Sequence, residues 1–254
     1  MHLTPHGDPP LYFTFPGLET FGVAHATTSR HCPGIAPFTE PIVAGAVRGP
    51  FGVDVVPVLA GAGLASARIA YVRQVHGADV AEAPSSGGFV GDADILATGE
   101  RGVPLAIFTA DCLAIVLVDL DARALGLAHV GWRGTTRGAA QAAVAALVAR
   151  GARPERIRAA ISPSIGPCCY EVDEPVMSAF AAAYGAASKR WFTPSGEGHA
   201  RLDLWAANEA LLAAAGVDPE RLENARLCTA CHPELLYSYR RGHRGRLVTL
   251  AALP

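Results

Sequence analysis

The sequence has little charge and no strong imbalance of sign. Asp, Glu, Lys and Arg make up 17% of its 254 residues, and 21 basic against 23 acidic side chains leave a net charge of −2. That balance gives no broad basic surface for a nucleic acid partner. Long apolar runs are also missing, because Asp111 interrupts the most apolar stretch, at 103–118. A membrane span needs about 18 uninterrupted apolar residues, so we expect no membrane partner.

Cysteine is sparse as well, with six in the whole chain. The first residues also lack the cationic and apolar regions of an export signal. These observations favour a cytoplasmic protein with reduced thiols over a secreted disulfide framework. A chain of this length, 50% of it apolar, buries enough surface to fold without a disulfide or a metal. Any metal would therefore have a role other than holding the core together.

The distribution of apolar residues predicts one α/β domain over residues 1–254. Prolines recur throughout the first 65 residues, where we expect loops and short edge strands. From residue 69 onward, short aliphatic runs alternate with three alanine-rich segments, as in mixed α/β folds. Capping residues and glycines predict helices at 135–151, 173–185 and 203–216. The predicted strands are 69–75, 105–109, 113–118, 125–130, 157–162, 225–228 and 246–250, with a hairpin joining 113–118 to 125–130.

Three potential metal ligands stand at the ends of predicted strands, namely His76, Cys112 and His129. Small residues flank each of them, and strand ends are where a rigid scaffold holds functional side chains. Two imidazoles and one thiolate provide three ligands for Zn²⁺ and leave a fourth position open, which is the pattern of catalytic zinc. However, their spacing matches no short zinc-binding motif, and a cysteine on an apolar strand often only packs. From the pattern alone, a shared metal is a hypothesis.

The segment 129–137, HVGWRGTTR, predicts an anion site. Two glycines lead into a helix N-terminus, where free N–H groups and a nearby arginine suit a phosphate. The alternative is an ordinary glycine turn with arginines in solvent. The candidate phosphate ligands are Arg133, Gly134 and Thr135, with Arg240 and Arg241 as further sources of positive charge.

Four of the six cysteines fall into two short motifs. Cys228 and Cys231 precede His232 in a C-x-x-C-H pattern, which is typical of covalent haem attachment in exported proteins. The neighbours Cys168 and Cys169 would add two more thiolates for a structural zinc site, but adjacent cysteines rarely bind one tetrahedral ion. We therefore expect these four thiols to pack without a metal.

Eight segments, in this order between residues 70 and 250, resemble the laccase-domain family. Its members were once labelled polyphenol oxidases and are now regarded as zinc-dependent purine nucleoside phosphorylases with adenosine deaminase activity. Any one of the segments would be a weak signal, but the ordered set is specific. The segments are QVHG (74–77), DADILAT (92–98), TADCLAIVL (109–117), AHVGWRGT (128–135), SIGPCCYEV (164–172), LDL (202–204), Cys228-Thr229 and SYRR (238–241).

The resemblance implies a layered α/β/β/α sandwich of mixed sheets, with metal ligands at His76, Cys112 and His129. It also implies phosphorolysis of adenosine, inosine, guanosine and 5′-methylthioadenosine, together with deamination of adenosine. Zinc is the implied metal, with copper as an alternative in the isolated protein. Purine nucleosides and phosphate are the implied partners, in a monomer or a homodimer. The chain departs from the family at 242–243, where Gly-His replaces the usual Asp-Gly, and at 27–34, where an early family segment is matched only loosely.

Other classes of protein use some of the same residue types. A multicopper oxidase needs roughly ten histidines with His-x-His pairs, whereas the chain has nine histidines and no such pair. A metal-free hydrolase would use Cys112 as nucleophile and His129 or His76 as base, on an amide or a cell-wall precursor. A purine-binding module without turnover is a third interpretation. In the zinc enzyme, Asp111, and less directly Glu171, would orient a ligand or move a proton, unless it only caps a turn.

Overall fold

The computed structural model describes residues 3–35, 50–64 and 67–254, so part of the proline-rich stretch, 36–49, lies outside the described residues. Two large β-sheets, of seven and six strands, dominate the structure. In order across the sheet, the larger contains β1 (Thr4–His6), β2 (Tyr12–Thr14), β3 (Ala24–Thr28), β16 (Leu247–Ala252), β8 (Leu105–Thr109), β4 (Ala70–Arg73) and β6 (Gly88–Asp92). The smaller contains β15 (Leu222–Asn224), β11 (Arg158–Ile161), β9 (Leu113–Asp119), β10 (Ala124–Val130), β7 (Ile95–Thr98) and β5 (Val80–Glu82). A three-stranded sheet contains β12 (Glu171–Asp173), β14 (His199–Leu202) and β13 (Phe192–Gly196).

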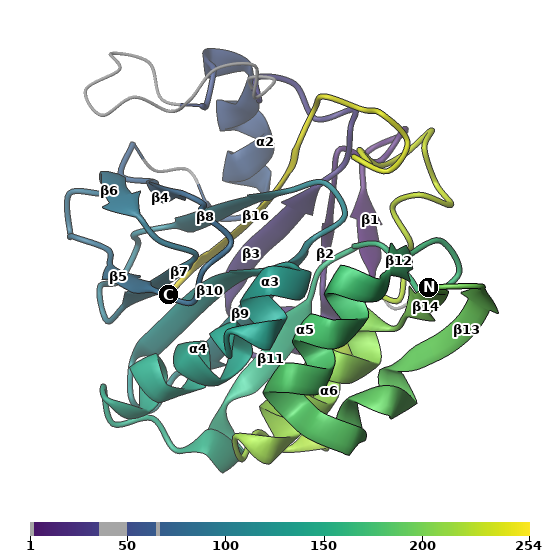
Figure 1. The fold of residues 1–254 in the computed structure, drawn as a ribbon. Helices are drawn as coiled ribbons and strands as arrows, with labels where there is room; N and C mark the ends of the chain where they lie inside the picture. The colour runs from purple at the N-terminus through teal and green to yellow at the C-terminus, as the bar shows by residue number, and fades with distance from the viewer. Residues whose placement is uncertain (1–2, 36–49, 65–66) are drawn as a thin grey trace.

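Helices cover the outer faces of the two large sheets, which gives the mixed-sheet α/β/β/α sandwich that the resemblance implied (Figure 1). The helices associated with the smaller sheet are α3 (Trp132–Thr136), α4 (Ala139–Val148), α5 (Glu174–Tyr184) and α6 (Leu204–Ala214). On the other side, α2 (Val56–Gly61) packs on the larger sheet, and α1 (Pro16–Thr20) joins β2 to β3. The short 3₁₀ helices are η1 (Val53–Val55), η2 (Pro154–Arg156), η3 (Gly185–Trp191) and η4 (Pro219–Arg221). No helix among the described residues is long and apolar enough to span a membrane.

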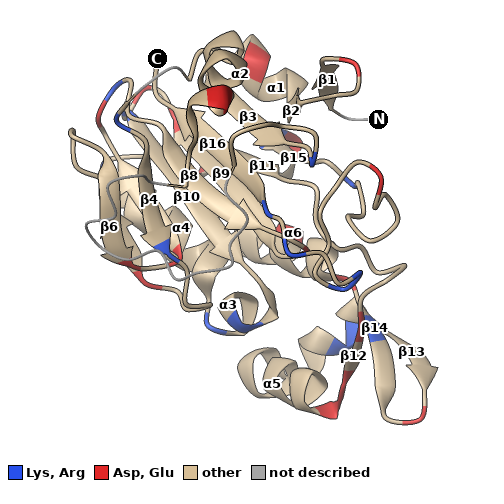
Figure 2. Cartoon of the chain, turned by 90° about the horizontal axis from the view of Figure 1, so that it is seen from above, with Lys and Arg blue, Asp and Glu red and all other residues tan. Residues whose placement is uncertain are grey.

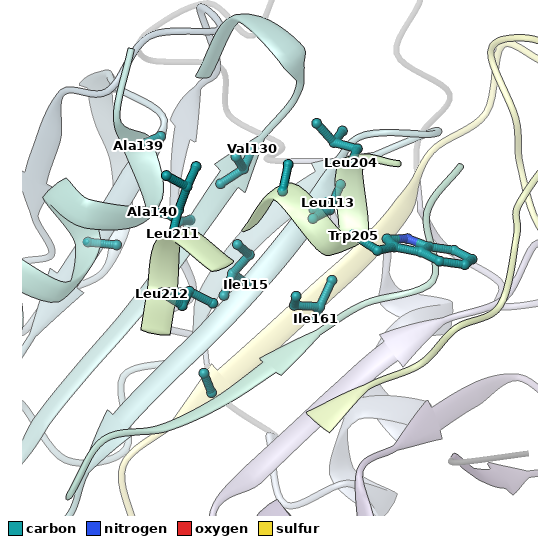
Figure 3. Packing of buried hydrophobic residues seen from close by; sticks show 14 of the residues in the cluster. Leu113, Ile115, Val130, Ala139, Ala140, Ile161, Leu204, Trp205, Leu211 and Leu212 are labelled. Atoms are coloured by element: carbon teal, nitrogen blue, oxygen red, sulfur yellow. The ribbon is translucent and has the colours of Figure 1, made fainter. Parts of the chain in front are cut away.

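Strand β9 shows how the sequence builds these layers. Between residues 113 and 118, the odd-numbered side chains pack beneath the helices and the even-numbered ones face the larger sheet. Figure 3 shows Leu113 and Ile115 together with Leu211 and Leu212 of α6. Because successive strand residues point to opposite faces and both faces are buried, the strand is apolar throughout instead of alternating with polar residues.

Strands β9 and β10 form the predicted antiparallel hairpin. Leu113 pairs with Val130, and Ala114 pairs with His129. This register places Cys112, directly before β9, at the same end of the sheet as His129. The hairpin therefore brings two of the predicted ligands together.

Most of the other predicted elements are confirmed to within a few residues. Helices α5 and α6 correspond to the predictions at 173–185 and 203–216, and the side chain of Asp203 caps α6 by accepting a hydrogen bond from Ala206 N. Strands β4, β8, β11 and β16 lie where strands were predicted.

Three predictions of elements were wrong. The helix predicted at 135–151 is two helices, because Gly138 takes a left-handed conformation (φ 79°) between them. No strand forms at 225–228; the strand β15 lies just before this range and ends at Asn224. Arg226 then takes a positive φ of 47°. In the proline-rich region, β3 is not an edge strand, because it pairs with β2 on one side and β16 on the other.

Candidate active site

The structure brings His76, Cys112 and His129 to one place, where their ligand atoms all lie within 4.8 Å of one another. The two imidazole rings meet edge to face, with centroids 4.8 Å apart. His129 lies on β10 and Cys112 directly before β9, both in the smaller sheet, whereas His76 follows β4 of the larger sheet. The cluster therefore depends on the packing of one sheet against the other.

The thiol of Cys112 and the imidazole of His129 are strongly coupled. Burial alone would raise the pKa of Cys112, but the charge of His129 and hydrogen bonds from His129 and His76 lower it to about 6. Burial likewise disfavours the charged form of His129, but the charge of Cys112 and the hydrogen bond with Asp94 raise its pKa to about 9. In the metal-free protein at neutral pH, the pair is therefore a thiolate beside an imidazolium.

Asp94 supports this cluster from behind and was not among the predicted site residues. Its carboxylate is completely buried, and Oδ1 accepts a hydrogen bond from Nδ1 of His129 at 2.7 Å. The backbone N–H groups of Val75, His76 and Gly77 also donate to this carboxylate. Burial opposes ionisation, but the hydrogen bonds from His129 and Gly77 prevail and lower the pKa of Asp94. An ionised Asp94 keeps a proton on Nδ1 of His129, so Nε2 is the nitrogen that would lose its proton to bind a metal.

A sequence signal for Asp94 was available. It stands within DADILAT, and it is a charged residue directly before a fully buried strand, β7. A buried carboxylate in that position needs several hydrogen-bond donors. The prediction missed Asp94 because the segment 95–98 was not recognised as a strand.

The backbone is unusual at the two loops that carry His76 and Cys112. His76 has a φ of 59° and Asp111 a φ of 92°, values that residues with side chains rarely adopt. Asp94 holds the first loop through its bonds to the N–H groups of residues 75–77. Asp111 anchors the second loop, since its two carboxylate oxygens accept from Thr229 Oγ1 (2.6 Å) and Arg240 N (2.7 Å). Such conformations persist where the surroundings hold them, often at functional sites.

Gly131 is required beside the cluster for a steric reason. A Cβ atom at this position would lie 2.8 Å from Sγ of Cys112 and 3.6 Å from a ring carbon of His76. Cβ atoms do not approach other atoms that closely, so any side chain here would displace the thiol. The glycine thus leaves room for the side chains of Cys112 and His76.

The cluster lines a cavity of about 620 Å³. Aromatic side chains form part of its wall, and arginines stand among them: Arg133 lies over the ring of Trp132 at 4.2 Å and Arg240 over Tyr170 at 5.5 Å. Basic segments at α3 and on a loop beside α6 are drawn blue in Figure 2. Burial raises the pKa of Tyr170, so its hydroxyl remains a hydrogen-bond donor. A flat aromatic ligand carrying or accompanied by an anion fits these walls.

Not every predicted site residue reaches the cavity. Arg133, Arg240 and Asp111 line it, whereas Gly134, Thr135, Arg241 and Glu171 do not belong to its lining. The hydroxyl of Thr135 donates to Gly131 O and accepts from Asn208 Nδ2, so it is already engaged in the protein interior. The guanidinium of Arg241 donates to Ala230 O, and the carboxylate of Glu171 accepts from Ser195.

Fold and site together define a layered α/β protein with a Cys-His-His group inside a basic, aromatic-lined cavity. Residues 57–254 match the family described as multi-copper polyphenol oxidoreductase laccase, and the chain belongs to this family. The resemblance read from the sequence motifs is thereby confirmed.

Relatives of the chain carry enzyme names. A purine nucleoside phosphorylase of Deinococcus radiodurans is 42% identical over 194 residues, which is 76% of this chain and 73% of the relative. Adenosine deaminase RL5, from an unknown prokaryotic organism, is 38% identical over 148 residues, covering 58% of this chain and 56% of the relative. The crystal structure of YlmD from Geobacillus stearothermophilus matches with a TM-score of 0.83 at 30% identity, over 98% of both chains.

Proposed function

We propose that the chain is a metal-dependent enzyme that phosphorolyses purine nucleosides and also deaminates adenosine. The observation that carries this proposal is the convergence of His76, Cys112 and His129 in the wall of one cavity. The names of the relatives support the substrate class.

The donor set fits a zinc ion. One thiolate and two imidazoles are ligands that Zn²⁺ prefers, and three protein ligands leave room for a reactant. Asp94 orients His129 as a carboxylate orients a ligand histidine in metalloenzymes. Gly131 keeps the space beside Cys112 open. When bound there, zinc supplies a Lewis acid and promotes deprotonation of water.

The remaining cavity residues would bind the two substrates. Arg133 and Arg240 would hold phosphate, since guanidinium groups bind phosphate oxygens through paired hydrogen bonds. The rings of Trp132 and Tyr170 would hold the purine, with the Tyr170 hydroxyl as a donor. In phosphorolysis, a phosphate oxygen bonds to the anomeric carbon of ribose while the purine leaves with the electrons of the C–N bond. In deamination, water adds at C6 of adenine and ammonia leaves.

Multicopper oxidation is not part of the proposal despite the family description. Within the described residues, His76 and His129 are the only histidines that belong to a group able to hold a metal. A multicopper cluster needs several histidines around each of its metals.

A second candidate function rests on Asp94. Cys112, His129 and Asp94 are arranged as nucleophile, base and orienting carboxylate, which is also the arrangement of metal-free cysteine hydrolases. Such an enzyme would act on an amide and would lose no activity when a chelator removes any bound metal.

The test combines metal analysis with assays of both reactions on wild-type protein, Cys112→Ala and Cys32→Ala. Cys32 is a buried cysteine outside the cavity lining, so it provides a matched control. We expect Cys112→Ala to lose about one zinc per chain, together with phosphate-dependent base release and ammonia release from adenosine. Full activity in wild-type protein whose metal has been removed by a chelator, or in Cys112→Ala, would overturn the proposal. Activity on amides that survives chelation would favour the hydrolase.

A further inference from the structure

A second group of potential metal ligands lies apart from His76, Cys112 and His129. The sulfurs of four cysteines all lie within 4.8 Å of one another: Cys168, Cys169, Cys228 and Cys231. Sγ of Cys231 is 3.4 Å from Sγ of Cys168 and 3.4 Å from Sγ of Cys169. From the sequence, these thiols were expected to pack without a metal, because adjacent cysteines rarely bind one tetrahedral ion, yet Cys168 and Cys169 both contact Cys231.

Two tight turns, held side by side, create this arrangement. In the first turn, Cys169 N donates to Gly166 O at 3.0 Å, and in the second, Cys231 N donates to Cys228 O at 3.2 Å. The segments run parallel where Ser164 pairs with Cys228. Each turn contributes two sulfurs, and backbone hydrogen bonds fix their positions before any ion binds.

The distances between the sulfurs suit one tetrahedral ion. A zinc–sulfur bond of about 2.3 Å places the sulfurs of a four-thiolate site about 3.8 Å apart. The contacts of 3.4 Å and the outer limit of 4.8 Å lie on either side of that value. The widest separation would have to close by about 1 Å, shared between two sulfurs, to bring all four to bonding distance from a central ion.

Packing alone does not account for the cluster. Cys168 and Cys231 are exposed, so neither is held in place by burial. Gly166 N donates to Sγ of Cys228 at 3.2 Å, a bond that stabilises a thiolate.

We propose that Cys168, Cys169, Cys228 and Cys231 form a second metal site, which binds a soft divalent cation such as Zn²⁺ through four thiolates. Four protein ligands leave no open position, which is characteristic of a structural metal. The site does not depend on the reaction proposed above.

The position of the cluster gives this metal a role. Thr229, inside the second turn, donates to Asp111, and Ile165 N, at the start of the first turn, donates to Asp111 O at 2.9 Å. Tyr170, directly after Cys169, lines the cavity. An ion joining the two turns would therefore fix one wall of the cavity and the loop that presents Cys112.

Metal content separates the two sites. We expect about two zinc ions per chain in the wild type and in Cys32→Ala, and about one in Cys231→Ser and in Cys112→Ala. Zinc-edge X-ray absorption of Cys112→Ala should show four sulfur neighbours at about 2.3 Å and no nitrogen. Equal metal content in Cys231→Ser and the wild type, or nitrogen around the zinc that remains in Cys112→Ala, would overturn the proposal.

Thiol labelling of Cys112→Ala gives a second test. It leaves the four clustered cysteines unchanged, so it does not require a variant of the cluster to fold. With metal bound, the four cluster thiols should resist alkylation of the native protein, and a chelator should expose all four together. Rapid labelling without chelator would contradict a metal site. Mass spectrometry of the protein as isolated could instead find no metal and a disulfide from Cys231 to Cys168 or Cys169. That result would also overturn the metal site and would show that these cysteines form a disulfide pair.

Discussion

The carboxylate of Asp94 and the imidazole of His129 form a buried pair, with Oδ1 2.7 Å from Nδ1 and side chains 0% and 3% exposed. The same carboxylate binds the backbone of the loop that carries His76. One acidic residue therefore sets the ring orientation of His129 and the backbone position of His76, two of the proposed ligands. Its loss should therefore weaken metal binding although Asp94 is not itself a proposed ligand.

Asp94→Asn tests this relationship. An amide is neutral and can turn an N–H toward His129, so the histidine is no longer held with its proton on Nδ1. We expect the affinity for zinc to fall by about 10- to 100-fold, measured by competition with a chromophoric chelator. Asp92→Asn is the matched control, because Asp92 lies two residues away in an exposed pair with Arg73. If Asp94→Asn lowers the melting temperature but leaves the zinc affinity unchanged, Asp94 stabilises the fold and does not position a ligand.

Local pattern was sufficient to predict that two of the three proposed ligands lie close together. Cys112 and His129 stand at the start of one predicted strand and near the end of the next, and a hairpin with a short connection brings those positions together. The apolar run from 113 to 118 was equally informative, because a strand buried on both faces must lie between two layers.

The rest of the site depends on contacts between distant segments. His76 lies in the loop after β4 of the larger sheet and reaches Cys112 only through the packing of the sheets. Asp94 comes to His129 because Ile95 pairs with Ala128, a register that no short-range pattern reveals. Thr135 illustrates the opposite error: threonine suits a cap or a phosphate site, yet its hydroxyl bonds to Gly131 and Asn208. Hydroxyl partners of this kind are set by tertiary packing.

The reactivity of Cys112 should report its ionisation. With a pKa of about 6, the thiol of the metal-free protein is mostly thiolate at pH 7 and becomes protonated as the pH falls below 6. We therefore expect iodoacetamide to modify Cys112 at a nearly constant rate above pH 7 and about tenfold more slowly at pH 5. Peptide mass spectrometry at timed intervals measures the rate.

Cys32 is the internal control for that experiment. Burial raises its pKa to about 11, so it should stay unmodified from pH 5 to pH 8 while the protein is folded. Zinc should protect Cys112 across the whole range, because the sulfur is then a ligand. Rapid labelling of the zinc-loaded protein would instead identify Cys112 as a free nucleophile and support the hydrolase.

Gly131→Ala tests the space beside the thiol. The new Cβ would start 2.8 Å from Sγ of Cys112, and the φ of −91° at this position is acceptable for alanine. The substitution should therefore displace the ligand without straining the backbone. We expect loss of zinc at this site and a decrease in kcat/KM of about 100-fold for both reactions. Gly196→Ala is the control: its new Cβ meets no atom within 4 Å, so zinc content and kcat/KM should not change. A Gly131→Ala protein with full zinc content and normal activity would contradict the steric argument.

Arg133→Gln separates the two proposed reactions. Phosphorolysis needs a bound phosphate, whereas deamination does not, so removal of one guanidinium should affect only the first. A lost hydrogen bond to a charged group corresponds to roughly a tenfold or greater rise in the KM for phosphate. The KM for adenosine in deamination should stay within about twofold, which shows that the cavity is intact. Arg221→Gln, in an exposed pair with Asp218, should change neither value. An unchanged KM for phosphate in Arg133→Gln would contradict this role and indicate that Arg240 binds the phosphate instead. Equal losses in both reactions would show that Arg133 acts on the purine.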